Sequence, residues 1–194
     1  MMQHKELAES VLCFLKTLPQ VKQCGLYGSL AENCADEYSD IDIQADVSGT
    51  DNGSFALALP RLLSRNYPII FYDFAPSLAP EQYVVTLALD AGSPFMLVDL
   101  SSTADPHCAN VSKQALRALN NRYDHVLKLF SANLKHFIRG ADCSADIFKM
   151  QAKLFSPGEC TFHEDEALKK VYRWLKENAP ERRRPYVASF ARYL

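Results

Sequence analysis

The sequence of 194 residues lacks the features that would place it in several specialised classes of protein. No apolar run approaches the roughly 20 residues that a helix needs to cross a bilayer. Residues 1–15 alternate charged and apolar positions and so lack the continuous apolar core of a signal peptide. There are no internal repeats and no low-complexity segment. We therefore expect a cytoplasmic protein with no membrane partner.

The cysteines lack the spacing of a metal site or a redox motif. None of the six forms a CxxC pair, and the chain is large for a disulfide scaffold. This pattern predicts reduced thiols, several of them buried as small apolar residues. The six are Cys13, Cys24, Cys34, Cys108, Cys143 and Cys160.

The chain also lacks an excess of either charge sign. It carries 21 Lys and Arg against 23 Asp and Glu, for a net charge of −2 and a pI near 6.2. This balance lacks the excess of positive charge that is typical of nucleic-acid-binding proteins, so we do not expect nucleic acid as a partner. A composition of 48% hydrophobic and 23% charged residues is typical of a globular protein.

What is present divides into two parts of different character. Helical spacing covers residues 4–17 and 55–65, and short extended runs cover residues 21–27, 39–47, 68–74, 81–89 and 94–100. After Asp105-Pro106 the pattern becomes helical throughout. We predict an α+β protein, with a mixed sheet and flanking helices in residues 1–105 and an all-helical subdomain in residues 106–194.

Two aspartates stand one residue apart in the second extended run. Asp40 and Asp42 alternate with Ile41 and Ile43, so the carboxylates share one face of a strand and the isoleucines the other. Aspartate is depleted in strands, and like charges on one face repel each other. A shared hard cation such as Mg²⁺, which takes its other ligands from water and phosphates, would offset that cost. The alternative is a solvent-facing strand with surface carboxylates.

A two-metal phosphoryl-transfer site requires a third carboxylate. Asp99 lies within an apolar run at residues 95–100, and Asp73 within another at residues 69–74. We favour Asp99 because its flanks are more apolar, although an aspartate near a strand end can also cap a turn. Gly28-Ser29, separated from the Asp-x-Asp pair by ten residues, would let the backbone approach a phosphate closely.

This ordered set of residues resembles the DNA polymerase β-like nucleotidyltransferase superfamily. The likeness rests on Gly28-Ser29, on Ser39 and on Asp40-Ile41-Asp42-Ile43, and within the superfamily it is closest to the small bacterial antibiotic and minimal nucleotidyltransferases. Many members carry a glycine four residues after the motif serine. Here that position is Asn33, which tolerates the left-handed conformation better than most residues.

The resemblance implies an activity and a set of site residues. It implies transfer of a nucleoside monophosphate, AMP from Mg-ATP or another NTP, to a hydroxyl of a small molecule such as an aminoglycoside or lincosamide. Two Mg²⁺ ions would be held by Asp40, Asp42 and Asp99, and Gly28, Ser29 and Ser39 would contact the nucleotide. Lys135 and Arg139, four apart on a helix, could reach the triphosphate or form a solvated basic face.

Two other activities stay open at this point. One is a toxin–antitoxin type nucleotidyltransferase that modifies a protein or a tRNA, and the other is a catalytically silent nucleotide-binding regulator. A homodimer is also open, because a small two-part enzyme often completes its acceptor pocket in that way.

Overall fold

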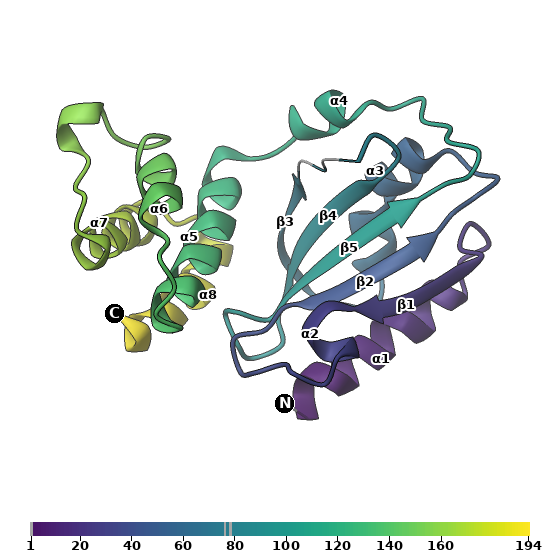
Figure 1. Cartoon of the computed structure of the whole chain (residues 1–194), viewed down its shortest axis with the longest axis horizontal. Coiled ribbons are helices and arrows are strands. Elements are labelled where there is room, and N and C mark those ends of the chain that lie inside the picture. The colour runs from purple at the N-terminus through teal and green to yellow at the C-terminus, as the bar shows by residue number, and fades with distance from the viewer. Residues whose placement is uncertain (1, 76, 78) are drawn as a thin grey trace. The chain divides into compact units, whose positions relative to one another are not determined.

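The computed structural model describes residues 2–75, 77 and 79–194, and these form two compact units. The units divide between Asn120 and Asn121. The first contains a five-stranded sheet with helices, and the second consists of helices and their connections (Figure 1). The predicted α+β class, with a mixed sheet followed by a helical part, is confirmed.

The sheet mixes parallel and antiparallel neighbours in the order β1-β2-β5-β4-β3. Of the neighbouring pairs in this sheet, β2 and β5 are parallel and the others are antiparallel, including β4 and β5, which follow each other along the chain. The five extended runs expected from the sequence all form strands. Their bounds are β1 Gln23–Tyr27, β2 Ile41–Asp46, β3 Ile69–Ala75, β4 Tyr83–Leu89 and β5 Leu97–Thr103.

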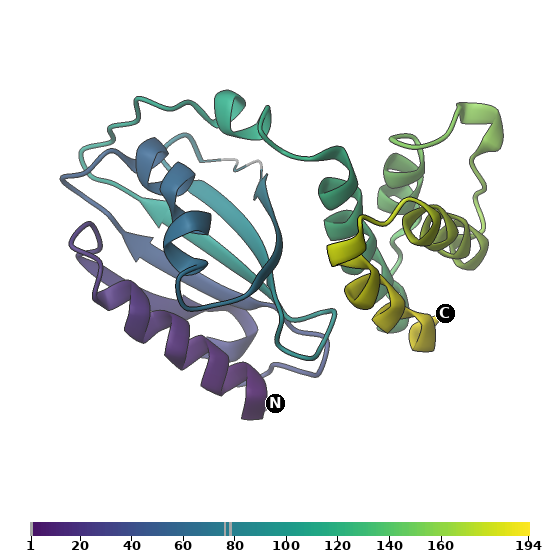
Figure 2. The ribbon, with the colours of Figure 1, turned by 180° about the vertical axis from the view of Figure 1, so that it is seen from behind.

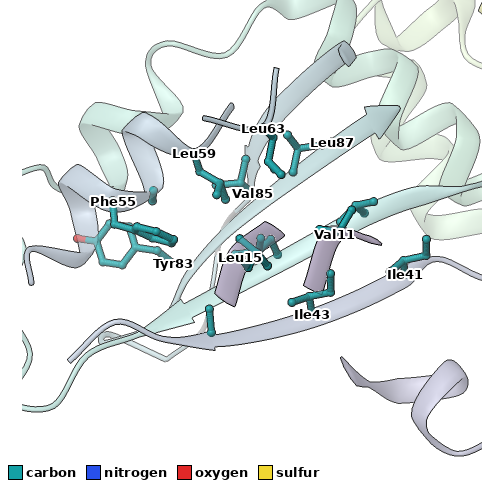
Figure 3. Close-up of a cluster of buried hydrophobic side chains, with 14 of the residues drawn as sticks. Val11, Leu15, Ile41, Ile43, Phe55, Leu59, Leu63, Tyr83, Val85 and Leu87 are labelled. Atoms are coloured by element: carbon teal, nitrogen blue, oxygen red, sulfur yellow. The ribbon is translucent and has the colours of Figure 1, made fainter. Parts of the chain in front are cut away.

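Helices α1 (Met2–Lys16) and α3 (Asn52–Leu63) pack on one face of this sheet (Figure 2). The spacing of apolar residues along each helix directs one stripe toward the strands. Asp51 starts α3 by accepting a hydrogen bond from the backbone N–H of Ser54, as an N-cap residue does. Figure 3 shows the resulting core, whose labelled members are Val11, Leu15, Ile41, Ile43, Phe55, Leu59, Leu63, Tyr83, Val85 and Leu87.

The opposite face of the sheet is polar at β1 and β2. Along β2 the burial alternates, with Ile41, Ile43 and Ala45 fully buried while the residues between them keep exposed surface. Figure 1 looks onto this second face, with α1 and α3 behind the strands. We call it the open face. It carries Asp42, and Asp40 precedes β2 on the same side by alternation.

The first unit extends beyond the boundary that we predicted between residues 105 and 106. Residues 106–120, including α4 (Lys113–Arg117), remain with the sheet. The side chain of Asn120 accepts a hydrogen bond from the N–H of Phe74 and donates one to its carbonyl, covering the outer edge of β3. Tyr83 donates to the carbonyl of Val111. The change of sequence pattern at Asp105 therefore marks the end of the last strand.

The second unit is built around the long helix α5 (Arg122–Ile138). Its core is apolar and aromatic, with Phe130 stacked on Tyr172 and edge-on to Phe190. Arg183 reaches back to Asp124 in the first turn of α5, with nitrogen–oxygen distances of 3.0 and 3.1 Å. The other elements are α6 Ser144–Gln151, η1 Pro157–Glu159, α7 Glu164–Glu177, η2 Glu181–Arg183, α8 Arg184–Ala188 and η3 Ser189–Tyr193.

The two units carry opposite net charges. Residues 1–120 contain 7 Lys and Arg against 14 Asp and Glu, a net −7, and residues 121–194 contain 14 against 9, a net +5. The total of −2 is the sum of these two values, so it says little about either unit. The total charge therefore does not exclude a nucleic-acid partner for the basic helical unit, contrary to our expectation. In the described part of the chain, no helix is both long and apolar enough to span a membrane.

Candidate active site

A row of functional side chains crosses the open face from strand to strand. Tyr27 of β1 pairs in register with Asp42 of β2, and Asp42 pairs with Asp99 of β5. Asp99 pairs with Thr86 of β4, and Thr86 with Asp73 of β3. Residues paired in register point to the same face of a sheet. Three carboxylates, one hydroxyl and one phenol therefore lie in a single row.

The parallel pairing of β2 and β5 decides which carboxylate lies beside Asp42. Asp99 is on the neighbouring strand, about 4.8 Å away between backbones. Asp73 lies two strands beyond Asp99, at roughly three times the distance from Asp42, and is fully buried. The topology therefore places Asp99, and not Asp73, beside Asp42, and the role of Asp99 as third carboxylate stays a prediction. Asp99 also accepts a hydrogen bond of 2.5 Å from the Thr86 hydroxyl.

Gly28 lies directly against the Asp42 carboxylate. Its φ of +64° is in the left-handed region, and a Cβ built on it would stand 2.6 Å from Asp42 Oδ2. Both the backbone conformation and the close approach require glycine here. Gly28 opens the short helix α2 (Gly28–Ala31), which contains Ser29. Asn33 follows with a φ of 56°, so asparagine does adopt the left-handed conformation expected for the turn.

The loop before β2 positions Asp40. The Ser39 hydroxyl donates to the Asp36 carboxylate at 2.9 Å and accepts from the Asp36 N–H at the same distance. Ser39 is buried, and these bonds order the chain that enters the strand. The Oδ1 atom of Asp40 is buried as well. Ser39 thus has a structural role in this loop, and its contact with a nucleotide stays a prediction.

The carboxylates change the titration of their neighbour Tyr27. Partial burial, together with the negative charges of Asp42 and Asp99, raises the pKa of Tyr27 to about 12. The phenol is therefore protonated at neutral pH and can donate a hydrogen bond toward the anionic row. Sequence reasoning missed both Tyr27 and Thr86. Their only signal is register, which the sequence does not contain without the strand order.

Lys135 and Arg139 lie in the helical unit. Lys135 is buried near the end of α5 and Arg139 is the C-cap residue, whose backbone N–H bonds to the Lys135 carbonyl at 3.2 Å. They are one turn apart, as predicted. Burial, followed by the positive charges of Lys135 and Arg139, lowers the pKa of His136 between them. Their contact with a triphosphate stays a prediction.

The donor set of the row fits a hard cation by its chemistry. Carboxylate oxygens are the ligands that Mg²⁺ prefers, and Asp42 and Asp99 project side by side from neighbouring strands. The side chains are not assembled as a closed cage: among the described residues, no three His, Cys, Asp or Glu side chains group closely enough to hold a metal ion. Magnesium usually takes one or two carboxylates together with substrate phosphates and water, which suits two adjacent aspartates.

Comparisons with known proteins yield structural similarities only. No family model matches the chain, and no curated protein is significantly similar to it. A structure of the Cid1 poly(U) polymerase bound to MgATP aligns at 15% identity with a TM-score of 0.42, over 86% of this chain and 47% of that one. A GLD-2/RNP-8 complex aligns at 15% identity and a TM-score of 0.39, over 99% and 56%. The chain thus spans about half the length of these structures, and similarities this weak assign it no family.

Proposed function

We propose that this protein transfers a nucleoside monophosphate from a magnesium-bound nucleoside triphosphate to an acceptor hydroxyl. The observation that carries the proposal is the pairing of Asp42 with Asp99 in neighbouring parallel strands, with Gly28 packed against Asp42. Like charges side by side destabilise a sheet, and glycine with positive φ costs conformational entropy. A phosphoryl-transfer site explains both features together.

In the proposed reaction the acceptor oxygen attacks the α-phosphorus. A new oxygen–phosphorus bond forms, the bond between the α-phosphorus and the pyrophosphate oxygen breaks, and pyrophosphate leaves. Asp99 would take the proton of the acceptor hydroxyl as general base. Asp40, Asp42 and Asp99 would hold two Mg²⁺ ions, which supply charge neutralisation at the phosphates when bound.

Within this activity we favour ATP as the donor and a small molecule as the acceptor. The resemblance of residues 25–43 to the antibiotic nucleotidyltransferases supports this choice, as does the net −7 of the first unit, which suits a cationic acceptor. Gly28 and Ser29 would contact the triphosphate.

A second candidate acceptor is the end of an RNA. The net +5 of residues 121–194 favours it, because basic surface attracts a phosphate backbone regardless of sequence. Under this reading the helical unit binds the polyanion and the row of carboxylates performs the transfer. The affinity for RNA would then fall steeply with salt.

The test measures pyrophosphate release from each of the four Mg-NTPs, against a panel of aminoglycosides, lincosamides and a short oligoribonucleotide. Mass spectrometry of the acceptor identifies the product. We expect release that depends on both an acceptor and Mg²⁺, with the acceptor heavier by one nucleoside monophosphate. NTP binding without release across the panel would contradict the small-molecule and RNA acceptors, and would favour a protein acceptor or the silent regulator.

A further inference from the structure

A glycine in the middle of an edge strand leaves a hollow on the open face. Gly25 is the third of five residues in β1 and pairs in register with Gln44. A Cβ built on it would meet nothing within 4 Å, and its φ is not in the left-handed region. Neither crowding nor backbone conformation therefore explains glycine here. Glycine weakens a strand interior and often marks a place where a ligand approaches the backbone.

The hollow is a cavity of about 270 Å³ on the same face as the row of carboxylates. Gln44 and Asp46 follow Asp42 at intervals of two along β2, and Thr103 pairs in register with Asp46. Residues two apart in a strand share a face. The cavity is lined by Gln23, Cys24, Gly25 and Leu26 of β1, by Gln44 and Asp46 of β2, and by Thr103 of β5.

The polar side chains of this cavity are suited to hydroxyls and an amine. Gln23 and Gln44 are exposed amides that both donate and accept, and Thr103 adds a hydroxyl. Asp46 accepts a hydrogen bond of 2.8 Å from the Ser48 N–H, and hydrogen bonding from Ser48 lowers its pKa. Asp46 is therefore ionised at neutral pH, and a carboxylate favours a cation over a phosphate.

The position of the cavity connects it with the proposed reaction. At about 3.3 Å per residue along a strand, Gln44 lies about 7 Å and Asp46 about 13 Å beyond Asp42. A molecule of two or three rings seated over Gly25 spans that distance and presents one hydroxyl at the row. We propose that this hollow is the acceptor subsite, and that it takes a small polyhydroxylated molecule carrying an amine. The assignment rests on the proposed function.

Binding of kanamycin, a polyhydroxylated polyamine, to the full-length protein tests the subsite without any turnover. In ¹H–¹⁵N NMR titrations we expect the amide signals of Gly25, Gln44 and Thr103 to shift. Gly25→Val fills the hollow with a residue that suits a strand, and should weaken binding by about tenfold or more. The matched control is Gly158→Val, at a glycine where a Cβ also meets nothing within 4 Å, and it should leave the affinity unchanged.

The amine is tested with Asp46→Asn, which removes the charge and keeps the acceptor oxygen for Ser48. We expect kanamycin to bind about fivefold to tenfold more weakly and the neutral polyol myo-inositol to be unaffected. The proposal would be overturned if the signals that shift belong only to other residues, or if both glycine variants lose the same affinity for kanamycin. It would also be overturned if an oligoribonucleotide shifts the same three amide signals and binds more tightly than kanamycin.

This experiment separates the subsite from the transfer reaction. The titration contains no NTP, so it reports binding at the cavity whether or not transfer takes place. Kanamycin binding at Gly25 without transfer would contradict the proposed function and leave the binding site standing. If Gly25→Val leaves the rate of transfer to the acceptor unchanged, the result would contradict the subsite and not the transfer reaction.

Discussion

The two units of this chain differ in both architecture and charge. The sheet unit is acidic, with a net −7, and it gathers carboxylates on one open face, whereas the helical unit is basic, with a net +5. In the helical unit, opposite charges form ion pairs such as that of Arg183 with Asp124. In the sheet unit, Asp42 and Asp99 are like charges placed side by side. The two units therefore place charge differently, and the adjacent carboxylates of the sheet unit are the feature on which the proposed function rests.

The largest expected effect comes from comparing two aspartates within the row. Asp99→Asn should lower the rate of pyrophosphate release by about 10²–10⁴-fold, as loss of a general base does. Asp73→Asn, on the same row but two strands further from Asp42, should lower it far less. Steady-state rates of both variants, with thermal unfolding as the check on folding, measure the difference. Equal losses in two folded variants would contradict the assignment of Asp99.

Removing a carboxylate of the row should affect stability in the opposite direction from activity. Asp42→Asn removes one of two neighbouring like charges, so its melting temperature should equal or exceed that of the unmodified protein while activity is lost. The matched control is Asp90→Asn, in an exposed turn of the same unit, which should change neither quantity. A marked fall in melting temperature for Asp42→Asn would indicate that the carboxylate serves the fold.

Two glycines, one from each unit, separate backbone strain from contact with a carboxylate. Gly28 and Gly140 have φ values of +64° and +72°, but only at Gly28 would a Cβ meet Asp42 Oδ2. Gly140→Ala should cost about 1–2 kcal/mol of unfolding free energy for the left-handed conformation alone. Gly28→Ala should cost more and also lower activity. Denaturant unfolding of both variants measures the difference, and equal costs would contradict the close approach.

The ion pair of the helical unit tests whether the two units are stabilised separately. Asp124 and Arg183 are largely buried, with side-chain exposures of 13% and 22%. Arg183→Gln leaves the carboxylate buried without its cation and should destabilise the helical unit by about 1–3 kcal/mol. Amide hydrogen exchange should accelerate in residues 121–194 and stay unchanged in the sheet. Faster exchange in β2 and β5 as well would show that the units unfold together.

The smallest expected effect is in the titration of Tyr27. Its pKa in the folded state is raised to about 12, above the usual value of 10.0, by burial and by Asp42 and Asp99. The folded state therefore holds this proton more tightly than the unfolded state, so stability falls as pH rises from about 10 to about 12. Tyr27→Phe should remove that part of the fall, as measured by unfolding at several pH values. Ultraviolet titration of Asp42→Asn should find a lower pKa for Tyr27.

Much of the sheet unit could be predicted from local sequence because its strands alternate clearly. Asp40-Ile41-Asp42-Ile43 specifies which side chains enter the core, and β2 follows that pattern. The neighbours of Asp42 could not be predicted in the same way, because Tyr27 and Thr86 join the row only through strand order. The role of Gly25 could not be predicted from the sequence either, because it depends on the open space around this residue in the folded structure.

The boundary and the charge were harder to predict for a different reason. Residues 106–120 have a helical pattern, yet the contacts of Asn120 and Val111 keep them with the sheet. Tertiary contacts of this kind leave no local signal. The net charge of −2 follows directly from the sequence. Its division into −7 and +5 can be calculated only once the boundary between the two units is known.

The most direct test of the central claim is acceptor-dependent pyrophosphate release by the unmodified protein and by Asp42→Asn, measured side by side with Mg-ATP. The pairing of Asp42 with Asp99 predicts release by the first and a loss of about 10²-fold or more in the second, at an unchanged or higher melting temperature. Full activity of a folded Asp42→Asn protein would contradict the account.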